Sequence, residues 1–346
     1  MQRYNSSIIG KKSTVSASSA TGIFSMNNVA DERRLENWPI VKKSQYKSFT
    51  LNTFSGTYMY FHSFWTDQTA SSSVATKMFV ADDHANKIHE FSITNDDLST
   101  LSYTDAQTLP TTSIYLNSSI NSDGTKLTAW GRANNRVQSW EFSTAFDKST
   151  VSYQRFDDLG TSGADVVGGF WYDNGTKLQV VRETAHQLWY TSTAYDVSGF
   201  GTTASSASNF TNNHIRAVKH AYHQIPATGE ASSPAGFLSY FALGRNTASW
   251  SDNYDPYLMV NNSGTHTGYL IQNGANSLGG SSSPMNTATT YYFKGMFVPP
   301  DGSEIWVYGD TSSTNNSTST TLGRVLLRFK LNTAGTITSA SDIASF

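Results

Sequence analysis

The sequence contains no cysteine, few charged residues and no long apolar run, and each absence narrows the possibilities. Without cysteine, neither a disulfide framework nor a thiolate that binds a metal or attacks a substrate can form. No stretch approaches the ~20 apolar residues of a membrane-spanning helix, and the first residues lack the apolar segment of a secretion signal. We therefore expect no membrane span and no export by a standard signal.

Charge is scarce and nearly balanced. The 346 residues include 24 Lys and Arg and 26 Asp and Glu, so the net charge is −2 and only 14% of residues are charged. This balance gives no electrostatic reason to expect binding to nucleic acid. Aromatic residues make up 13% of the chain, and Ser, Thr and Asn supply most of its polarity, as is typical of exposed strands and turns.

One hairpin-like segment is repeated along the chain. Its landmark is a lysine at positions 77, 126 and 177, so that the copies lie 49 and 51 residues apart. In each copy an aliphatic residue follows eleven positions later, in the pairs Lys77 and Ile88, Lys126 and Val137, and Lys177 and Leu188. A fourth copy has Glu304 and Val325 at these positions, with a longer loop between them. We expect the copies to share one hairpin register.

Further strand-like segments flank each hairpin, which gives units of about four antiparallel strands. Units of ~40–50 residues with four short strands are typical of β-propeller blades. The stretch from about 205 to 285 supplies strands for one more unit. The sequence therefore predicts an all-β fold, a β-propeller of about five four-stranded blades over residues 46–346. We also expect KSFTLNTF (47–54) to pair with the last blade near RVLLRFKL, because such pairing closes many propellers.

The first 45 residues differ from the rest and predict an N-terminal arm. A small, polar, extended stretch precedes GIFSMNNVADERRLENWPI, in which Asn27 or Asn28 can cap a short helix that Pro39 ends. Phe24, Val29 and Leu35 give this helix an apolar stripe. A single short helix is not stable by itself, so we expect the arm to dock on a partner.

The arm and the repeats carry a resemblance to a known group of proteins. SATGIFSMNNVADERRLENWP resembles an N-terminal "SGIW" segment of structural proteins of marine bacteriophages, with Phe24 where that segment usually has Trp. The DGTKL-like repeats at 123, 173 and 301 resemble propeller repeats of such phage proteins and of marine bacterial surface proteins.

The resemblance implies a virion component that is tail-associated or decorates the particle. It would be assembled in the host cytoplasm, present in multiple copies, and in contact with other virion proteins of the tail or capsid. A glycan of the host cell surface is a second expected partner. The expected partner-binding residues of the arm are Gly22, Ile23, Phe24, Met26, Val29, Leu35, Trp38 and Pro39.

Several acidic residues could form a catalytic or metal-binding site. Asp123, Asp173 and Asp301 lie in Gly-containing turns, where hairpin formation explains them. Asp82–Asp83 and Asp157–Asp158 lie at strand ends, where solvation is favoured over calcium binding. The remaining acids considered are Asp165, Glu183, Asp252 and Asp255.

Histidines and aromatic residues were weighed in the same way. His214, His220 and His223 cannot all face one metal from a single strand, because alternate residues point to opposite faces. Aromatic side chains within strands favour core packing over sugar stacking; they are Tyr58, Tyr60, Phe64, Trp65, Trp171 and Trp189. We therefore expect no catalytic residues, no cofactor and no metal, and a chain that is not an enzyme. The alternatives are a host-glycan-binding adhesin and a carboxylate-based glycoside hydrolase.

Overall fold

The structure is a computed structural model, and it describes part of the chain. The described residues are 15–16, 19–20, 43–49, 63–69, 71–82, 85–110, 117–131, 136–159, 166–172, 175–182, 185–199, 206–209, 222–224, 240–244, 257–262, 265–271, 291–311, 323–335, 337, 339, 342–344 and 346.

The chain divides into two compact units, Met1–Lys43 and Ser44–Phe346. In the first unit the described residues form a small hairpin, in which β1 (Val15–Ser16) pairs antiparallel with β2 (Ser19–Ala20). The short helix expected between the cap at Asn27 or Asn28 and Pro39 lies outside the described residues.

The second unit is built from strands, among which two 3₁₀ turns are described. In chain order the strands are β3 (Gln45–Phe49), β4 (Phe64–Thr66), β5 (Lys77–Asp82), β6 (Lys87–Thr94), β7 (Asp97–Thr108), β8 (Asn117–Ile120), β9 (Lys126–Gly131), β10 (Arg136–Phe142), β11 (Val151–Asp158), β12 (Val166–Tyr172), β13 (Lys177–Arg182), β14 (Ala185–Tyr190), β15 (Ser206–Asn209), β16 (Tyr222–Gln224), β17 (Tyr240–Gly244), β18 (Tyr257–Asn262), β19 (Thr265–Leu270), β20 (Tyr292–Phe297), β21 (Glu304–Asp310) and β22 (Arg324–Lys330). The turns are Lys148–Thr150 and Val197–Gly199.

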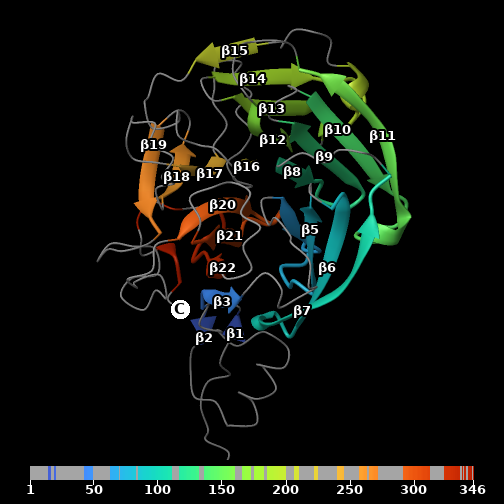
Figure 1. Ribbon diagram of the computed structural model, residues 1–346. Helices are drawn as coiled ribbons and strands as arrows, with labels where there is room; N and C mark the ends of the chain where they lie inside the picture. Colours follow the sequence, from blue (N-terminus) through green and yellow to red (C-terminus); the bar gives the residue numbers. More distant parts are fainter. Residues whose placement is uncertain are drawn as a thin grey trace, which may run out of the picture. The chain divides into compact units, whose positions relative to one another are not determined.

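These strands form five four-stranded antiparallel sheets, which we number in chain order. Sheet 1 is β4-β5-β6-β7, sheet 2 is β8-β9-β10-β11, sheet 3 is β12-β13-β14-β15, sheet 4 is β16-β17-β18-β19 and sheet 5 is β20-β21-β22-β3. The first strands of consecutive sheets are neighbours, and β20 in turn neighbours β4, so the sheets close into a ring (Figure 1). The second unit is a β-propeller, and the predicted all-β fold class is confirmed.

The ring is closed by a strand from the beginning of the unit. β3 completes sheet 5 as its outer strand, pairing with β22 from Phe49 opposite Arg324 to Gln45 opposite Arg328. Ser44 Oγ donates a hydrogen bond of 2.6 Å to the carbonyl of Ala344, which ties the two ends of the unit together. The predicted pairing of this segment with the last blade is confirmed, over Gln45–Phe49.

The core lies between adjacent sheets, and this explains the burial pattern of the strands. In sheet 5, every residue of β21 is buried, as are all but the last of β22, because both faces of a middle strand are covered by neighbouring sheets. The outer strand β11 alternates between half-buried and exposed residues instead. Consequently, charged side chains on the middle strands are placed in the interior and require partners there.

The hairpin register is shared by sheets 1 and 2 but not by sheet 3. Ile88 lies opposite Ala81 and Val137 opposite Trp130, which in each case is the fourth residue after the landmark lysine. Leu188 lies opposite Gln179, only two residues after Lys177. The reason is a shorter loop, since two residues separate β13 from β14 whereas four separate β5 from β6. The common register predicted from the constant spacing of eleven residues is therefore wrong for sheet 3.

Candidate functional site

The residues predicted to bind a partner through the arm lie outside the described residues. They are Gly22, Ile23, Phe24, Met26, Val29, Leu35, Trp38 and Pro39. Their role stays a prediction.

A turn after the third strand of the sheet recurs in sheets 1, 2 and 3. Each turn contains a left-handed residue at one common position, with φ of 55° at Asp96, 55° at Phe146 and 59° at Tyr195; in sheet 1 Asn95 is left-handed as well. The next residue is an aspartate that accepts the backbone N–H of a serine two positions on, in the pairs Asp97 and Ser99, Asp147 and Ser149, and Asp196 and Ser198. Each turn faces the preceding sheet, so the residues around it determine what the interface contains.

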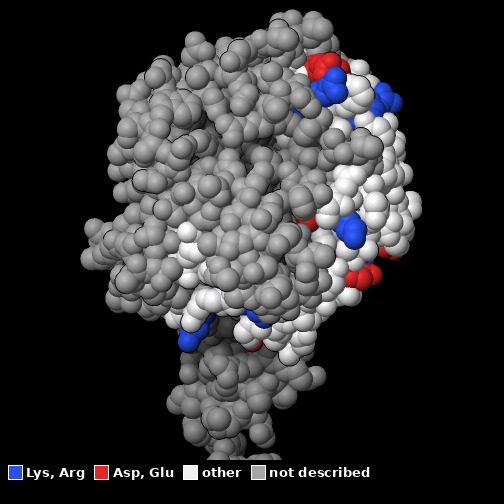
Figure 2. All heavy atoms as spheres, viewed as in Figure 1, with Lys and Arg blue, Asp and Glu red and all other residues white. Residues whose placement is uncertain are grey.

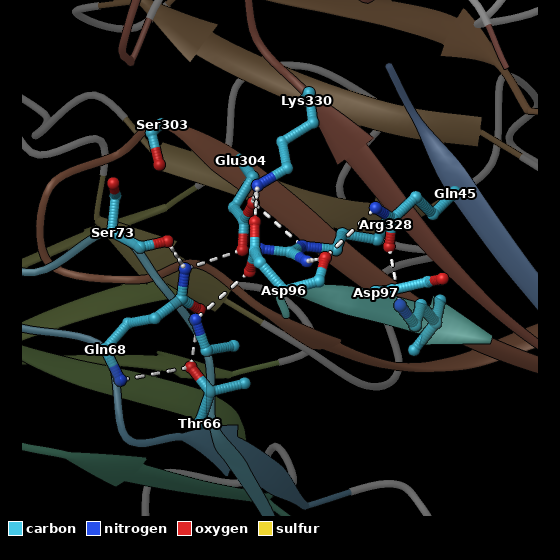
Figure 3. A network of polar contacts seen from close by, with 12 residues as sticks. Gln45, Thr66, Gln68, Ser73, Asp96, Asp97, Ser303, Glu304, Arg328 and Lys330 are labelled. Atoms are coloured by element: carbon cyan, nitrogen blue, oxygen red, sulfur yellow. Dashed lines mark hydrogen bonds and ion pairs between the residues drawn. The ribbon is translucent and has the colours of Figure 1, made fainter. Parts of the chain in front are cut away.

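The interface between sheets 5 and 1 contains a network of buried charges (Figure 3). Arg328 donates from Nε to Glu304 Oε2 at 2.9 Å, and both side chains are fully buried. The Arg328 guanidinium also donates to the backbone carbonyl of Asp96 at 2.8 Å and pairs with the Asp96 carboxylate. Lys330 Nζ lies 2.6 Å from Glu304 Oε2 and 3.0 Å from Asp96 Oδ2. Two cations thus face two carboxylates across the point where the ring closes.

Neutral side chains complete the hydrogen bonding of this network. Gln68 Nε2 and Trp306 Nε1 each donate to Glu304 Oε1 at 2.7 Å. Gln45 on β3 donates to the carbonyl of Asp96 at 3.1 Å and accepts the N–H of Leu98 at 2.7 Å. Because Glu304 has donors on both oxygens and a buried position, we assign this network to ring closure and not to binding or catalysis.

The interface between sheets 1 and 2 is filled by one lysine. Lys148, from the turn of sheet 2, reaches Glu90 Oε2 at 2.8 Å and Asp105 Oδ1 at 2.5 Å, and Glu90 Oε1 lies 3.3 Å from Lys77 Nζ. Burial lowers the pKa of Lys148, but its hydrogen bonds to Asp105 and Glu90 outweigh burial, so the pKa is raised above its ordinary value. Lys148 is therefore a charged structural group.

The interface between sheets 2 and 3 contains a cavity of about 190 Å³. Its lining includes Ser139, Trp140, Gln154, Arg155, Thr193 and Tyr195. The first four come from sheet 2, and the last two come from the turn of sheet 3. Among the described residues, this is the cavity where polar and aromatic side chains from two sheets meet, and it is the candidate functional site.

Tyr195 forms one wall of the cavity and is held both by its backbone and by its ring. Its N–H donates to the carbonyl of Gly175 at 2.7 Å, and its ring lies edge-to-face with Trp171 at 5.6 Å between centroids. Burial raises the pKa of the Tyr195 hydroxyl, and the charge of Asp123 raises it further. The hydroxyl is therefore neutral at physiological pH, and the ring is a fixed wall.

Both cations at this site have carboxylate partners. Lys126 Nζ lies 2.6 Å from Glu141 Oε1, and Arg155 Nη1 lies 3.7 Å from Asp196 Oδ1. The pKa of Asp196 is lowered, first by the backbone N–H of Ser198, so this carboxylate is ionised. On the face shown in Figure 2, described basic and acidic side chains are likewise interspersed.

Two other buried polar groups lie at strand ends. His89 Nε2 is 3.4 Å from Asp82 Oδ2, with 2% and 0% of the side chains exposed. In sheet 5, Arg324 Nε donates to the Tyr308 hydroxyl at 3.1 Å, and this hydroxyl donates to Asp310 Oδ2 at 3.3 Å. Burial strongly raises the pKa of Tyr308. These groups are buried, so the expectation that Asp82 is solvated at its strand end is wrong.

The described acids that were weighed as catalytic groups are in structural roles. Asp123 accepts the backbone N–H of Thr125 at 3.0 Å, and Asp301 accepts that of Ser303 at 3.0 Å, as expected of turn formers. Asp158 pairs with Arg136 at 2.8 Å on the outer strand β11. Asp83, Asp165, Asp173, Glu183, Asp252 and Asp255 lie outside the described residues.

Aromatic and histidine candidates separate in the same way. Phe64, Trp65 and Trp189 are at most 2% exposed, which confirms core packing for these three. Trp171 donates its indole N–H to Thr128 Oγ1 at 2.8 Å, whereas Tyr58 and Tyr60 lie outside the described residues. His214 and His220 also lie outside them, and within the described ranges no group of three or more His, Cys, Asp or Glu side chains is placed to hold a metal ion.

The cavity between sheets 2 and 3 was not predicted from the sequence, because the signal for it is a difference between the residues that the repeats have at equivalent positions. The turn after the third strand reads TAFD in sheet 2 and TAYD in sheet 3, and neither segment alone indicates where its aromatic ring lies. Aligning the turns puts Asp96, Phe146 and Tyr195 at one position and shows that the residue two positions later changes from Lys148 in sheet 2 to Val197 in sheet 3.

No family model and no curated protein matches this chain. Solved structures do match it. An exo-β-1,3-galactanase from Phanerochaete chrysosporium is 13% identical with a TM-score of 0.47, over 84% of this chain and 65% of its own. A GH43 β-1,3-galactosidase is 10% identical with a TM-score of 0.45, over 82% of this chain and 60% of its own. A Lactobacillus plantarum protein is 9% identical with a TM-score of 0.35, over 78% and 68%.

These comparisons overturn the expectation that the chain is not an enzyme, because two of the matched structures are enzymes. The expectation rested on the lack of short catalytic motifs. In a propeller, catalytic side chains can come from different blades, so they converge in space without forming a motif in the sequence. At these identities the likeness concerns the fold alone and names no reaction for this chain.

One further finding concerns membranes. No helix in the described part of the chain is long and apolar enough to cross one.

Proposed function

We propose that the chain is a structural component of a phage virion, tail-associated or decorating the particle, in which the arm attaches a propeller that contacts other proteins or the host surface. The observation that supports this proposal is the division of the chain near residue 43, since Met1–Lys43 is a compact unit separate from the propeller. This unit contains the segment that resembles the N-terminal segment of phage structural proteins.

The closed ring suits such a role. The pairing of β3 with β22 covers the outer edge of sheet 5, and the contacts of Arg328 with Asp96 and of Glu304 with Gln68 join sheet 5 to sheet 1. A particle protein that presents a binding surface benefits from a rigid support, because less order is lost on binding. Several copies on one particle would multiply a modest affinity.

The test has two parts. Antibody raised against residues 44–346 should label purified particles in negative-stain images, at the tail, a vertex or the capsid face. A chain that begins at Ser44 should fold, as judged by its circular dichroism and melting temperature, but should be absent from particles. A Trp38→Ala variant should reduce incorporation, and Lys11→Ala serves as its matched control in the same arm.

Two outcomes would contradict the proposal. One is the absence of the protein from purified particles. The other is normal incorporation of the chain that begins at Ser44, which would place the attachment on the propeller.

A second candidate function is recognition of a host-surface glycan, and the cavity between sheets 2 and 3 favours it. Its lining combines the ring of Tyr195 with hydroxyl and amide side chains.

A further inference from the structure

Three interfaces of the ring place different side chains at one common position. Glu90, Ser139 and Arg328 each lie opposite the second residue after the landmark position, namely Phe79, Thr128 and Trp306. On the neighbouring outer strand, they face Asp105, Arg155 and Gln45. The interfaces between sheets 5 and 1 and between sheets 1 and 2 can therefore be compared, at this position, with the interface between sheets 2 and 3, where the cavity lies.

At two of these interfaces the common position is filled by charge. Arg328 fills it between sheets 5 and 1 and binds Glu304 and Asp96. Between sheets 1 and 2, Glu90 and Lys148 fill it together. Both arrangements leave these side chains nearly or fully buried, since Arg328 is 0% exposed and Lys148 is 8% exposed.

Between sheets 2 and 3, smaller side chains stand at the positions that Glu90 and Lys148 occupy between sheets 1 and 2. Ser139 stands where sheet 1 has Glu90, and Val197 stands in the turn where sheet 2 has Lys148. Val197 is fully buried and packs with Trp130 and Trp189 in the core, so it does not occupy the space that the lysine would take. The cavity of about 190 Å³ is what remains.

The chemistry of the lining indicates a neutral ligand. Lys126 and Arg155 are already paired with Glu141 and Asp196, so a charged ligand would have to displace a carboxylate. Ser139, Gln154 and Thr193 supply hydroxyl and amide groups, which can both donate and accept hydrogen bonds. Tyr195 supplies ring surface beside them, whereas the ring of Trp140 is fully buried in the core with sheet 1.

The size of the cavity limits the ligand further. A volume of 190 Å³ equals about six water molecules at roughly 30 Å³ each and is smaller than the ~300–1,000 Å³ of pockets for drug-sized molecules. A single sugar ring has this size and combines hydroxyl groups with an apolar face.

We propose that the cavity between sheets 2 and 3 is a binding site for one neutral pyranose unit of a glycan. The sugar replaces the charged side chains that fill the other two interfaces, and it packs against Tyr195 while its hydroxyls bond to Ser139, Gln154 and Thr193. The proposal goes beyond membership of a virion, because the site binds its sugar whether or not the chain is part of a particle.

The decisive variant fills the cavity with the glutamate–lysine pair that occupies the interface between sheets 1 and 2. In Ser139→Glu/Val197→Lys, the two positions receive the residues found at Glu90 and Lys148. The full-length protein is titrated with methyl glycosides of glucose, galactose and mannose by saturation-transfer NMR. We expect saturable binding of at least one neutral glycoside by the unchanged protein, and binding at least about tenfold weaker in the filled variant, which corresponds to a loss of about one hydrogen bond or more.

Two more variants keep the test decisive if the filled variant is unstable. Gln154→Ala removes one exposed polar group of the lining and should weaken binding by at least about threefold. Glu90→Ser/Lys148→Val makes the reverse exchange at the interface of sheets 1 and 2 and should leave binding to the original cavity unchanged. Melting temperatures are recorded for all variants.

Three results would overturn the proposal. They are no binding of any neutral glycoside at tens of millimolar, binding only of a uronic acid such as methyl glucuronide, and equal binding by the unchanged protein and by Gln154→Ala and the filled variant.

Discussion

The left-handed turn residues show how single positions are constrained in this fold. Gly175 has a φ of 82° and lies directly under the ring of Tyr195. A Cβ at this position would come within 2.5 Å of the ring carbons Cδ2 and Cε2. Both the backbone conformation and the space therefore require glycine here.

We expect Gly175→Ala to lower the free energy of unfolding by about 2–4 kcal/mol, because it adds backbone strain and displaces a packed ring. Chemical denaturation measures the change. Gly323→Ala is the matched control, since its Cβ would meet only ordinary contacts, the nearest at 3.4 Å, and it should change stability much less. Equal effects of the two changes would show that the ring of Tyr195 does not confine Gly175.

The aspartates of the recurrent turn predict a dependence on pH. Asp147 accepts the Oγ–H and the backbone N–H of Ser149, and both hydrogen bonds lower the pKa of its carboxyl group. Since the folded pKa lies below the unfolded value of about 3.9, this stabilisation is complete above that pH and is lost as the pH falls through the folded pKa.

In Asp147→Asn we expect a loss of about 1 kcal/mol at pH 7, of the size found for capping residues, and a weaker decline of stability between about pH 4 and pH 2. Urea denaturation at several pH values measures both effects. The control is Asp158→Asn, which removes an exposed ion pair with Arg136 but closes no turn. A variant with the same pH profile as the unchanged protein would contradict this assignment.

At the scale of elements, β3 is the strand on which the ring depends. It covers the outer edge of β22, and its residues Gln45, Lys47 and Phe49 contact sheet 1 or the core. Without it, β22 would have an unpaired edge, and the hydrogen bonds of Gln45 and Lys47 to sheet 1 would be lost.

We therefore expect two truncations six residues apart to differ sharply. A chain of residues 44–346 should keep the stability of the propeller, whereas a chain of residues 50–346 should melt at least about 10 °C lower, as several lost hydrogen bonds and a buried Phe49 imply. Differential scanning calorimetry of both chains measures this. Melting temperatures within about 2 °C of each other would show that β3 adds little.

The elements were largely predictable because their signals are local. The equal spacing from Lys77 to Ile88 and from Lys126 to Val137 predicted one hairpin register, and sheets 1 and 2 have it. The pairing of β3 with β22 was predicted from the way propellers close, and it is confirmed. The register predicted for the third hairpin was wrong, because a loop shorter by two residues shifts the register without changing the spacing of the apolar positions.

The candidate site was not predictable from single segments. Glu304 was read as a landmark in place of lysine, yet it is fully buried, because Arg328 and Gln68 reach it from another strand and another sheet. The cavity depends on what Ser139 and Val197 leave unfilled when two sheets meet. Unfilled space of this kind can be recognised only when the interfaces between sheets are compared in the structure.

At the scale of the whole molecule, the network between sheets 5 and 1 is where closure is stabilised. Glu304 and Arg328 are both fully buried, so removing one leaves the other as an uncompensated charge. Glu304→Ala should therefore destabilise the propeller by about 3–5 kcal/mol.

Arg136→Ala is the comparison, since its ion pair with Asp158 has side chains 41% and 60% exposed and is expected to contribute less than about 1 kcal/mol. Both variants are measured by urea denaturation with far-ultraviolet circular dichroism. If Glu304→Ala is as mild as Arg136→Ala, ring closure does not depend on the network.

Closure by β3 also sets an order of events during synthesis. Phe49, the last residue of β3, leaves the ribosome 275 residues before Arg324, the first residue of its partner β22. At about 5–20 residues per second, the nascent chain carries β3 without its partner for roughly 14–55 s. During this time sheets 1 to 4 can form, but β3 stays unpaired because β22 has not yet been synthesised. The interval is when a chaperone that shields strand edges would matter most for this protein.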